Sequence, residues 1–223
     1  MGKDALLSAS VICADLLDLR RDLDALRGPG LDYLHFDVMD GRFVPSFGMS
    51  TRLLGLLTRS QPIPVEAHLM VTEPERHVPL VADSGAAMIT FHYEAQPKAG
   101  ALAEGIRKRG LKAGVALNPQ TPVAAVEPFL ELLDLVLIMC YTPPGPSREP
   151  LPATEGRVGQ LRDLALAKGR GDLMIALDGG ISEAQVARFR ASGANFFVLG
   201  TTGLFKPGVH LEEQLKRIRA AAR

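Results

Sequence analysis

Short runs of apolar residues recur along the chain at intervals that suit the strands of one repeating α/β fold. Several runs are apolar throughout, such as Leu-Val-Leu-Ile-Met at 135–139 and Phe-Phe-Val-Leu at 196–199. Continuous apolar runs of this kind are typical of parallel strands that are buried on both faces. The pattern predicts strands at residues 8–12, 33–38, 65–70, 88–92, 112–117, 135–139, 173–177 and 195–199.

Between these runs, apolar residues recur at the spacing of amphipathic helices. The first such segment has leucines at 16, 17, 19, 23 and 26, and it begins at Asp15, which suits a helix N-cap. The same pattern predicts helices at residues 15–27, 50–58, 74–84, 102–109, 123–133, 155–168, 182–192 and 210–222.

Strands and helices that alternate in this way over 223 residues predict a single closed (β/α)8 barrel, the TIM-barrel architecture, as one domain at 1–223. A doubly wound open sheet is the alternative, but such sheets usually have fewer strands, and the chain has no glycine fingerprint of a dinucleotide fold. The proline-rich residues 141–153 follow the sixth strand without a helix or strand pattern. Long loops at that end of a barrel are often functional, so we expect residues 141–153 to form a lid.

Composition and charge narrow the possible partners. Hydrophobic residues make up 47% of the chain, and 25 Lys and Arg residues balance 25 Asp and Glu residues. A neutral chain has no overall field that attracts nucleic acid or an anionic membrane, so we expect neither as a partner. Cys13 and Cys140 fit no metal-binding spacing, and no apolar run reaches the ~18 residues of a membrane span. We expect a cytoplasmic protein.

Polar side chains stand where several predicted strands end. His35 and Asp37 lie two residues apart on the second strand, so they share one face of it. His68 lies at the end of the third strand and Asp178 follows the seventh, and such strand ends meet at one mouth of a barrel. Two imidazoles and two carboxylates suit one divalent metal ion, such as Zn, Fe, Mn or Co. The alternative is a set of buried polar groups that only hydrogen-bond one another.

The remaining histidines are expected to have no chemical role. His92 ends the fourth strand, where we expect a hydrogen-bonded polar group of the core. His77 and His210 fall within or beside predicted helices, and we expect both on the protein surface.

Small residues follow the last two strands of the predicted barrel. Gly179 and Gly180 come after the seventh strand, and Gly200 and Thr201 come after the eighth. The corresponding loops of this fold commonly bind a phosphate through backbone N–H groups, with a short helix that residues 202–205 would supply here. The alternative is that these glycines only make tight turns.

Several motifs, spread over nearly the whole chain, are similar to those of one enzyme family. The longest of them runs from His35 to Pro45 and is highly specific. On these motifs the chain resembles ribulose-phosphate 3-epimerase and its close relative allulose-6-phosphate 3-epimerase. The motifs are Ser10-Val-Ile-Cys-Ala-Asp15, His35-Phe-Asp-Val-Met-Asp-Gly-Arg-Phe-Val-Pro45, Ala67-His-Leu-Met70, Phe91-His92, Leu117-Asn-Pro119, Leu137-Ile-Met139, Leu177-Asp-Gly-Gly180 and Gly200-Thr201.

The resemblance implies a metal-dependent 3-epimerase of a ketose phosphate, such as ribulose 5-phosphate to xylulose 5-phosphate, through an enediolate. The implied ligands of one divalent metal ion are His35, Asp37, His68 and Asp178. Asp37 and Asp178 are also the implied acid/base pair, which suits inversion because one acid can act on each face of the sugar carbon. The other implied substrate contacts are Ser10, His68 and a thioether cap of Met39, Met70 and Met139, although methionines equally suit ordinary core packing. Family members are commonly homo-oligomers, and we expect one here.

The chain departs from the family pattern near the expected phosphate. The family's loop after the sixth strand is rich in glycine, whereas residues 143–148 read Pro-Pro-Gly-Pro-Ser-Arg, and proline lacks a backbone donor. Arg148 either pairs with the phosphate instead or is a solvated loop residue. Ala176 and Cys13 replace a glutamate and a serine of many members, and Gly200-Thr-Thr-Gly-Leu-Phe205 is more similar to the allulose-6-phosphate branch. These departures leave the preferred ketose phosphate open.

Two rival functions remain on the same scaffold. A barrel that has lost catalysis could serve as a sugar-phosphate-binding protein, but such a protein has no reason to keep both carboxylates. A phosphosugar lyase or decarboxylase more often needs a lysine beside its aspartates, and no lysine falls at these strand ends.

Overall fold

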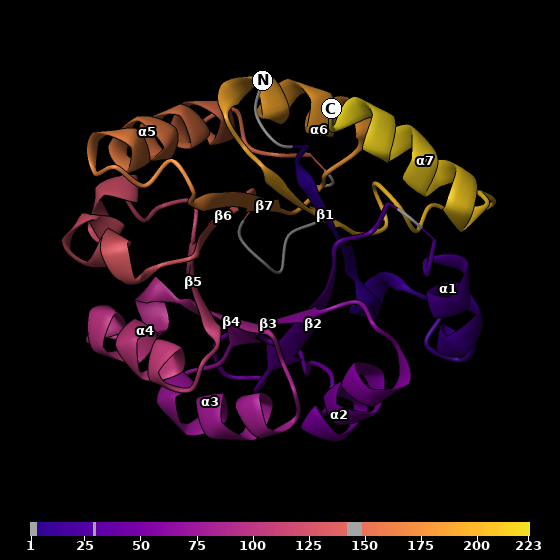
Figure 1. Ribbon diagram of the computed structural model, residues 1–223, viewed down its shortest axis with the longest axis horizontal. Helices are drawn as coiled ribbons and strands as arrows, with labels where there is room; N and C mark the ends of the chain where they lie inside the picture. The colour runs from indigo at the N-terminus through magenta and orange to yellow at the C-terminus, as the bar shows by residue number, and fades with distance from the viewer. Residues whose placement is uncertain (1–3, 29, 142–148) are drawn as a thin grey trace.

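The computed structural model describes residues 4–28, 30–141 and 149–223. Its strands form one closed parallel barrel in the order β1-β2-β3-β4-β5-β6-β7-β8, with the helices arranged around the outside (Figure 1). The predicted (β/α)8 barrel is therefore confirmed. The strands are β1 (Leu6–Ser10), β2 (Tyr33–Met39), β3 (Val65–Met70), β4 (Met88–His92), β5 (Lys112–Leu117), β6 (Leu135–Met139), β7 (Met174–Asp178) and β8 (Phe196–Leu199).

The helices of the outer layer follow the strands in turn. Within the described ranges, none of these helices combines the length and the hydrophobicity that a membrane-spanning segment needs. The helices are α1 (Leu19–Ala25), α2 (Thr51–Ser60), α3 (Pro74–Asp83), α4 (Ala99–Lys108), α5 (Thr154–Ala167), α6 (Glu183–Ser192) and α7 (Leu211–Ala221), with 3-10 helices η1 (Val11–Cys13), η2 (Tyr93–Ala95) and η3 (Val123–Leu132).

The first β/α unit differs most from its prediction. β1 ends at Ser10, two residues earlier than expected, because the chain turns into η1 there. α1 begins at Leu19 rather than at Asp15. Asp15 does not cap this helix, because its carboxylate accepts the backbone N–H of Leu17 at 3.1 Å inside the preceding loop. The loop after β1 is consequently longer than the sequence suggests.

The helical segment between β5 and β6 also differs in kind. The apolar spacing predicts a regular helix at 123–133, whereas the structure has the 3-10 helix η3. Pro128 lies inside this element, and the next residue, Phe129, has non-helical angles of φ −137° and ψ 18°. Proline interrupts a regular helix because it lacks an N–H and its ring clashes with the preceding turn.

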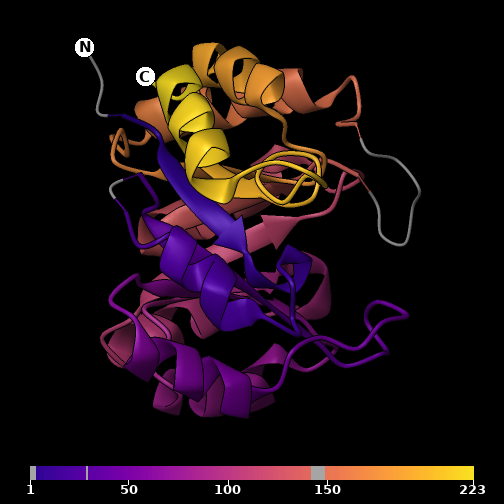
Figure 2. The same cartoon turned by 90° about the vertical axis from the view of Figure 1, so that its right-hand side faces the viewer.

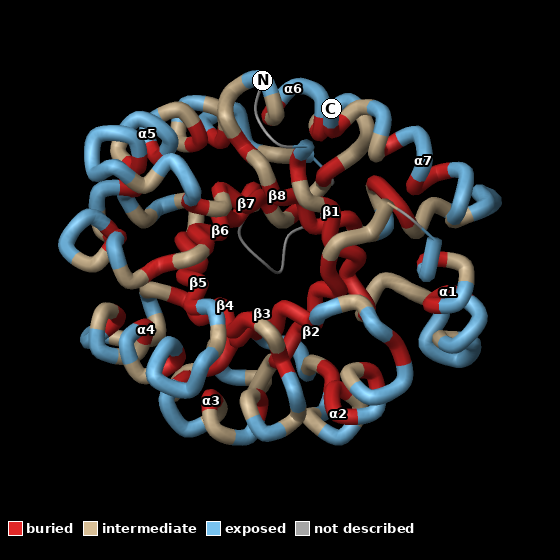
Figure 3. Tube along the Cα trace, viewed as in Figure 1, coloured by how far each residue is buried: buried red, intermediate tan, exposed pale blue. Residues whose placement is uncertain are grey.

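Apolar side chains fill two regions of the barrel. The larger cluster lies between the strands and the helices, and Figure 3 shows buried segments concentrated along the strands. A smaller cluster fills the barrel interior, and its buried members are Tyr33, Met88, Ala116, Leu135, Leu137, Met139, Ala176, Phe196 and Val198. Apolar side chains therefore fill much of the barrel interior below the strand ends that carry Asp37 and Asp178.

The side view separates the two ends of the barrel. In Figure 2 the C-terminus lies on the side where β1 begins, and the loop between β2 and α2 projects from the opposite side. That opposite side, where the strands end, is where enzymes of this fold carry their active sites.

Candidate active site

A cavity of about 500 Å³ opens at the C-terminal ends of the strands. His35 and His68 are fully buried at its edge. Arg148 lies outside the described residues, as do residues 142–147 of the expected lid. The other residues singled out from the sequence line the cavity: Ser10, Asp37, Met39, Met70, Met139, Asp178, Gly179, Gly180, Gly200 and Thr201.

The two imidazoles and two carboxylates converge at this cavity. His35 Nε2 lies 3.1 Å from Asp37 Oδ1 and 3.8 Å from Asp178 Oδ2. His68 Nδ1 lies 3.5 Å from the same Asp37 oxygen. His35, His68 and Asp178 each offer one ligand atom, and these atoms lie within 4.8 Å of one another. The structure thus brings together all four residues that the sequence selected as metal ligands.

Strand register explains this convergence. β2 and β3 pair in parallel with Asp37 opposite His68 and His35 opposite Glu66. Alternate residues of a strand point to the same side, so the side chains of both pairs enter the barrel interior. Asp178 reaches the same point from β7, across the barrel mouth. A shift of one residue in the pairing would turn these groups toward the helices.

The donor set suits a metal ion. Two imidazole nitrogens and carboxylate oxygens are ligands of divalent transition metals. His68 Nδ1 is buried, and no residue in the described part of the chain hydrogen-bonds to it. Buried polar atoms rarely lack a partner, and a bound ion is one of the ordinary reasons for an exception. The unpaired nitrogen and its neighbouring carboxylates therefore fit a metal ion at the point where the four side chains meet.

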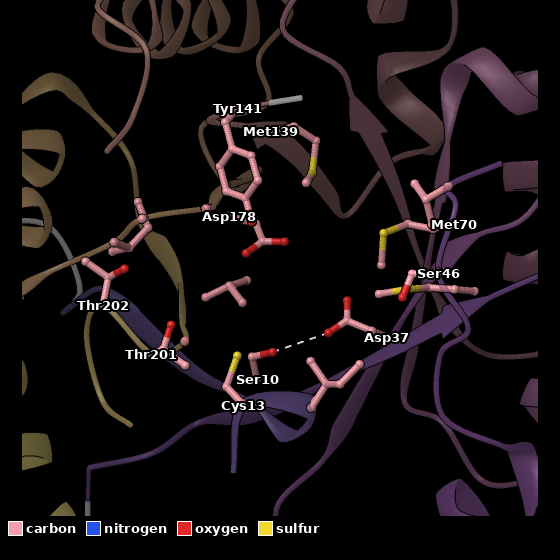
Figure 4. A pocket seen from close by; sticks show the side chains of 18 of the residues that line it. Ser10, Cys13, Asp37, Ser46, Met70, Met139, Tyr141, Asp178, Thr201 and Thr202 are labelled. Atoms are coloured by element: carbon pink, nitrogen blue, oxygen red, sulfur yellow. Dashed lines mark hydrogen bonds between the residues drawn. The ribbon is translucent and has the colours of Figure 1, made fainter. Parts of the chain in front are cut away.

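The two aspartates have different surroundings (Figure 4). Burial acts to raise the pKa of Asp37, but the adjacent His35 and His68 imidazoles bring that pKa well below its ordinary value. Burial raises the pKa of Asp178, where the attraction of His35 is opposed by the charge of Asp37. Ser10 Oγ also donates to Asp37 Oδ2 at 3.3 Å. Asp37 consequently holds its negative charge more firmly than Asp178 does.

The loop after β2 is held against the strand end that carries Asp37. Asp40 Oδ1 accepts the backbone N–H groups of Arg42 and Phe43, each at 2.8 Å. Its Oδ2 accepts the backbone N–H of Thr72 at 2.8 Å, which ties this loop to the end of β3. Asp40 is therefore a structural residue of the turn and directs no side-chain oxygen at the metal-ligand cluster.

The opposite wall of the cavity consists of backbone from the loops after β7 and β8. Gly179 and Gly180 have φ values of 107° and 70°, a conformation that favours glycine. The ring of Tyr141 packs so closely on Gly179 that a Cβ added there would lie 2.4 Å from the ring. Residues 202–205 form a hydrogen-bonded turn rather than the short helix expected, since the Gly200 carbonyl accepts the N–H groups of residues 203, 204 and 205.

Two residues near the centre, Tyr141 and Glu66, were not identified from the sequence. Tyr141 lines the cavity, where burial raises the pKa of its hydroxyl to about 12. Glu66 Oε2 lies 2.5 Å from His35 Nδ1, and the two-residue spacing of Glu66 and His68 on β3 could have revealed it. His92 is buried as expected, but its Nε2 lies 3.0 Å from His68 Nε2. Ala176, which stands where many family members carry a glutamate, lies within the apolar cluster of the barrel interior.

Fold and site together define the class of protein: a (β/α)8 barrel with a His and Asp centre at the mouth where such barrels carry active sites. The chain belongs to the ribulose-phosphate 3-epimerase family. The sequence model of the Ribulose-phosphate 3 epimerase family matches residues 6–205, which confirms the resemblance seen in the motifs.

Individual relatives agree with this assignment. The chain is 33% identical over 195 residues to a ribulose-phosphate 3-epimerase of Bacillus subtilis, covering 87% of this chain and 90% of that protein. It is 36% identical over 201 residues to a ribulose-phosphate 3-epimerase of Buchnera aphidicola, covering 90% and 87% of the two chains. The solved structure of 3-keto-L-gulonate-6-phosphate decarboxylase from Vibrio cholerae matches with a TM-score of 0.74 at 11% identity, covering 99% of this chain and 98% of that one, which shows a shared fold alone.

Proposed function

We propose that this protein is a metal-dependent 3-epimerase of a ketose phosphate. The observation that supports it most directly is the approach of Asp37 and Asp178 to one cavity from different strands, with His35 beside both carboxylates. Inversion of a sugar carbon needs a proton carrier on each face, and two carboxylates on separate strands meet that need. The named relatives support the same reaction.

The residues divide the chemistry among them. Asp37 or Asp178 removes the C3 proton, and the other carboxylate returns a proton to the opposite face. A metal ion bound by His35, Asp37, His68 and Asp178 would stabilise the charge on the substrate oxygens as a Lewis acid. Ser10 holds Asp37 by its hydrogen bond, which fixes one carboxylate oxygen. The thioethers of the cavity exclude water without offering a competing acid, and they are Met39, Met70 and Met139.

The phosphate of the substrate belongs at the glycine wall of the cavity. Gly179, Gly180, Gly200 and Thr201 offer backbone at the loops where barrels of this kind commonly bind phosphate. The role of Arg148 and the lid function of residues 141–153 remain predictions from the sequence. We propose ribulose 5-phosphate as the first substrate to test, because the relatives are named ribulose-phosphate 3-epimerases, with allulose 6-phosphate as the alternative. A homo-oligomer in the cytoplasm also remains a prediction.

Deuterium exchange tests this function. The protein is incubated in heavy water with ribulose 5-phosphate and, separately, with its four- and six-carbon ketose-phosphate relatives. We expect deuterium at C3 together with the epimerised product, and reversible loss of both after treatment with a chelator. Binding without exchange would support the non-catalytic sugar-phosphate-binding barrel, and carbon–carbon cleavage would support a lyase. Either result would contradict the proposal.

A further inference from the structure

Each imidazole of the proposed metal centre has one nitrogen facing the centre and one facing away from it. His35 Nε2 faces Asp37 and Asp178, and its Nδ1 contacts Glu66. His68 Nδ1 faces Asp37, and its Nε2 lies 3.0 Å from His92 Nε2. A carboxylate therefore contacts the outward nitrogen of His35 directly, whereas the outward nitrogen of His68 meets a second imidazole.

A carboxylate stands at the far end of that second imidazole. His92 Nδ1 lies 3.2 Å from Glu94 Oε2. The other oxygen of Glu94 accepts the backbone N–H of Asn118 at 2.9 Å and the hydroxyl of Thr121. The loop that supplies these donors is itself held by Arg157, whose guanidinium donates to the carbonyls of Asn118 and Thr121 at 3.0 and 2.8 Å. Glu94 is thus held from two sides in one orientation.

The contacts of Glu94 and His92 fix the direction of the hydrogen bonds. Burial acts to raise the pKa of Glu94, but its bonds from His92, Thr121 and Asn118 bring that pKa below the ordinary value, so the carboxylate is ionised at neutral pH. An ionised carboxylate can only accept hydrogen bonds. The contact between His92 Nε2 and His68 Nε2 pairs one N–H with one lone pair, and a neutral imidazole carries a single N–H.

With one N–H on each ring, only one arrangement of protons satisfies this series of hydrogen bonds. His92 Nδ1 must donate to Glu94, which leaves His92 Nε2 as an acceptor. His68 Nε2 must then donate to His92, and His68 Nδ1 keeps its lone pair. That nitrogen lies beside Asp37 and is a buried atom without a hydrogen-bond partner among the described residues. A metal ligand needs this unprotonated form.

We infer that Glu94 is a positioning residue that acts through His92 to hold His68 in the tautomer whose Nδ1 can bind a metal ion. The inference rests on the metal site of the proposed function, but not on the identity of the sugar. Glu66 sets His35 by direct contact, which is the usual arrangement of a metal-bound histidine. Glu94 sets His68 from one imidazole further away, so its effect depends on His92.

Nitrogen NMR tests the tautomers in the protein without metal. The chain has five histidines, and long-range ¹H–¹⁵N spectra of histidine-labelled protein distinguish an Nδ1–H ring from an Nε2–H ring. We expect His92 to carry its proton on Nδ1 and His68 on Nε2. Wild-type spectra with the proton of His92 on Nε2, or that of His68 on Nδ1 alone, would overturn the inference.

Glu94→Gln should reverse the direction of the hydrogen bonds from residue 94 through His92 to His68, with little change in the shape of the side chain at 94. The Gln carbonyl must accept the donors of Asn118 and Thr121, so its NH₂ group faces His92 Nδ1 and donates to it. His92 then donates from Nε2, and the proton of His68 moves to Nδ1. We expect the Kd for Zn²⁺, measured by competition with a chelating dye, to rise by about 10- to 100-fold. Glu104→Gln removes one surface carboxylate on α4 and should leave the Kd unchanged.

A double-mutant cycle separates positioning from charge. In a His92→Phe background, Glu94→Gln should have little further effect on the Kd for Zn²⁺, because the connection to His68 is already broken. An equal effect of Glu94→Gln with and without His92 would show that Glu94 acts only by its charge, and would overturn the inference. Wild-type protein with the expected tautomers but no affinity for divalent metals would overturn the proposed function instead.

Discussion

At the scale of single residues, the two cavity carboxylates are chemically alike but differently placed. Asp37 has a side chain only 7% exposed beside two imidazoles, whereas that of Asp178 is 22% exposed. Asp37→Asn and Asp178→Asn keep the shape and one oxygen ligand but cannot exchange a proton. We expect each to lower kcat for epimerisation by at least about 10²-fold, the lower range for a lost general acid or base.

These two substitutions need a measurement of bound metal beside that of turnover. Elemental analysis shows whether a variant has lost its metal ion, and only variants that retain it report on proton transfer. Near-normal turnover in either variant would remove that residue from the proposed acid/base pair.

Gly48 is a second residue on which the site depends. A Cβ at Gly48 would lie 2.4 Å from the backbone nitrogen of Met39 and 2.6 Å from the carbonyl oxygen of Asp37. Gly48→Ala must therefore displace the end of β2. We expect it to lower the free energy of unfolding by about 1–3 kcal/mol, as overpacking does, and to lower kcat.

Gly105→Ala is the matched control for Gly48→Ala. Gly105 lies within α4, and a Cβ there meets no atom within 4 Å. Alanine is favoured over glycine in a helix, so this control should stabilise the protein by about 0.5–1 kcal/mol. Urea denaturation measures both variants, and equal stability of the two would contradict the contact argument at Gly48.

Much of the site could be predicted at this scale, but its surroundings could not. The alternation of a strand is enough to put His35 and Asp37 on one face, and the family motifs supply His68 and Asp178. The contact of Glu66 with His35 depends on the register of β2 and β3. No sequence spacing indicates that His92 and His68 share a hydrogen bond, because side-chain orientation decides it.

At the scale of elements, predictions succeeded where burial is uniform. The apolar runs of β6 and β8 indicate strands directly, because both faces of a barrel strand are buried. Boundaries that depend on one polar side chain are harder to predict, because that side chain has several possible partners. Asp15 resembles a helix cap in sequence, but its carboxylate closes a turn in the loop before α1. Pro128 in η3 is a related case, because this proline interrupts the regular helix that the apolar spacing predicts.

The start of α6 provides a test at this scale. Ser182 caps the helix, and its side chain accepts the backbone N–H of Gln185 at 3.4 Å while Gln185 reaches back to the Ser182 backbone. Ser182→Ala removes this capping box and should lower the free energy of unfolding by about 1 kcal/mol. Ser182→Asp keeps an acceptor and should retain most of the stability. Equal losses in urea denaturation for the two variants would contradict the capping role.

At the scale of the whole molecule, the barrel closes between the first and last strands of the chain. β1 pairs with β8, and Leu6 donates its N–H to the carbonyl of Asn195 at 2.8 Å. Because each strand pairs with its neighbours on both sides, the barrel has no exposed edge. Closure joins the two ends of the sequence, so a side chain that spans this joint affects the stability of the entire fold.

Arg219 of α7 is that side chain. Its guanidinium donates to the carbonyls of Gly30 and Ala5, each at 2.6 Å, and pairs with Asp32, while only 16% of the side chain is exposed. Hydrogen bonds that involve a charged group contribute about 1.5–3 kcal/mol, and Arg219→Ala leaves several acceptors without a donor. We expect Arg219→Ala to lower the free energy of unfolding by about 3 kcal/mol in urea denaturation, with an unchanged m-value.

Arg217→Ala is the matched control. It removes an exposed guanidinium from the same helix and should cost less than about 0.5 kcal/mol. Similar losses for Arg219→Ala and Arg217→Ala would mean that packing alone, and not this cluster of hydrogen bonds, holds the last helix against the first strand.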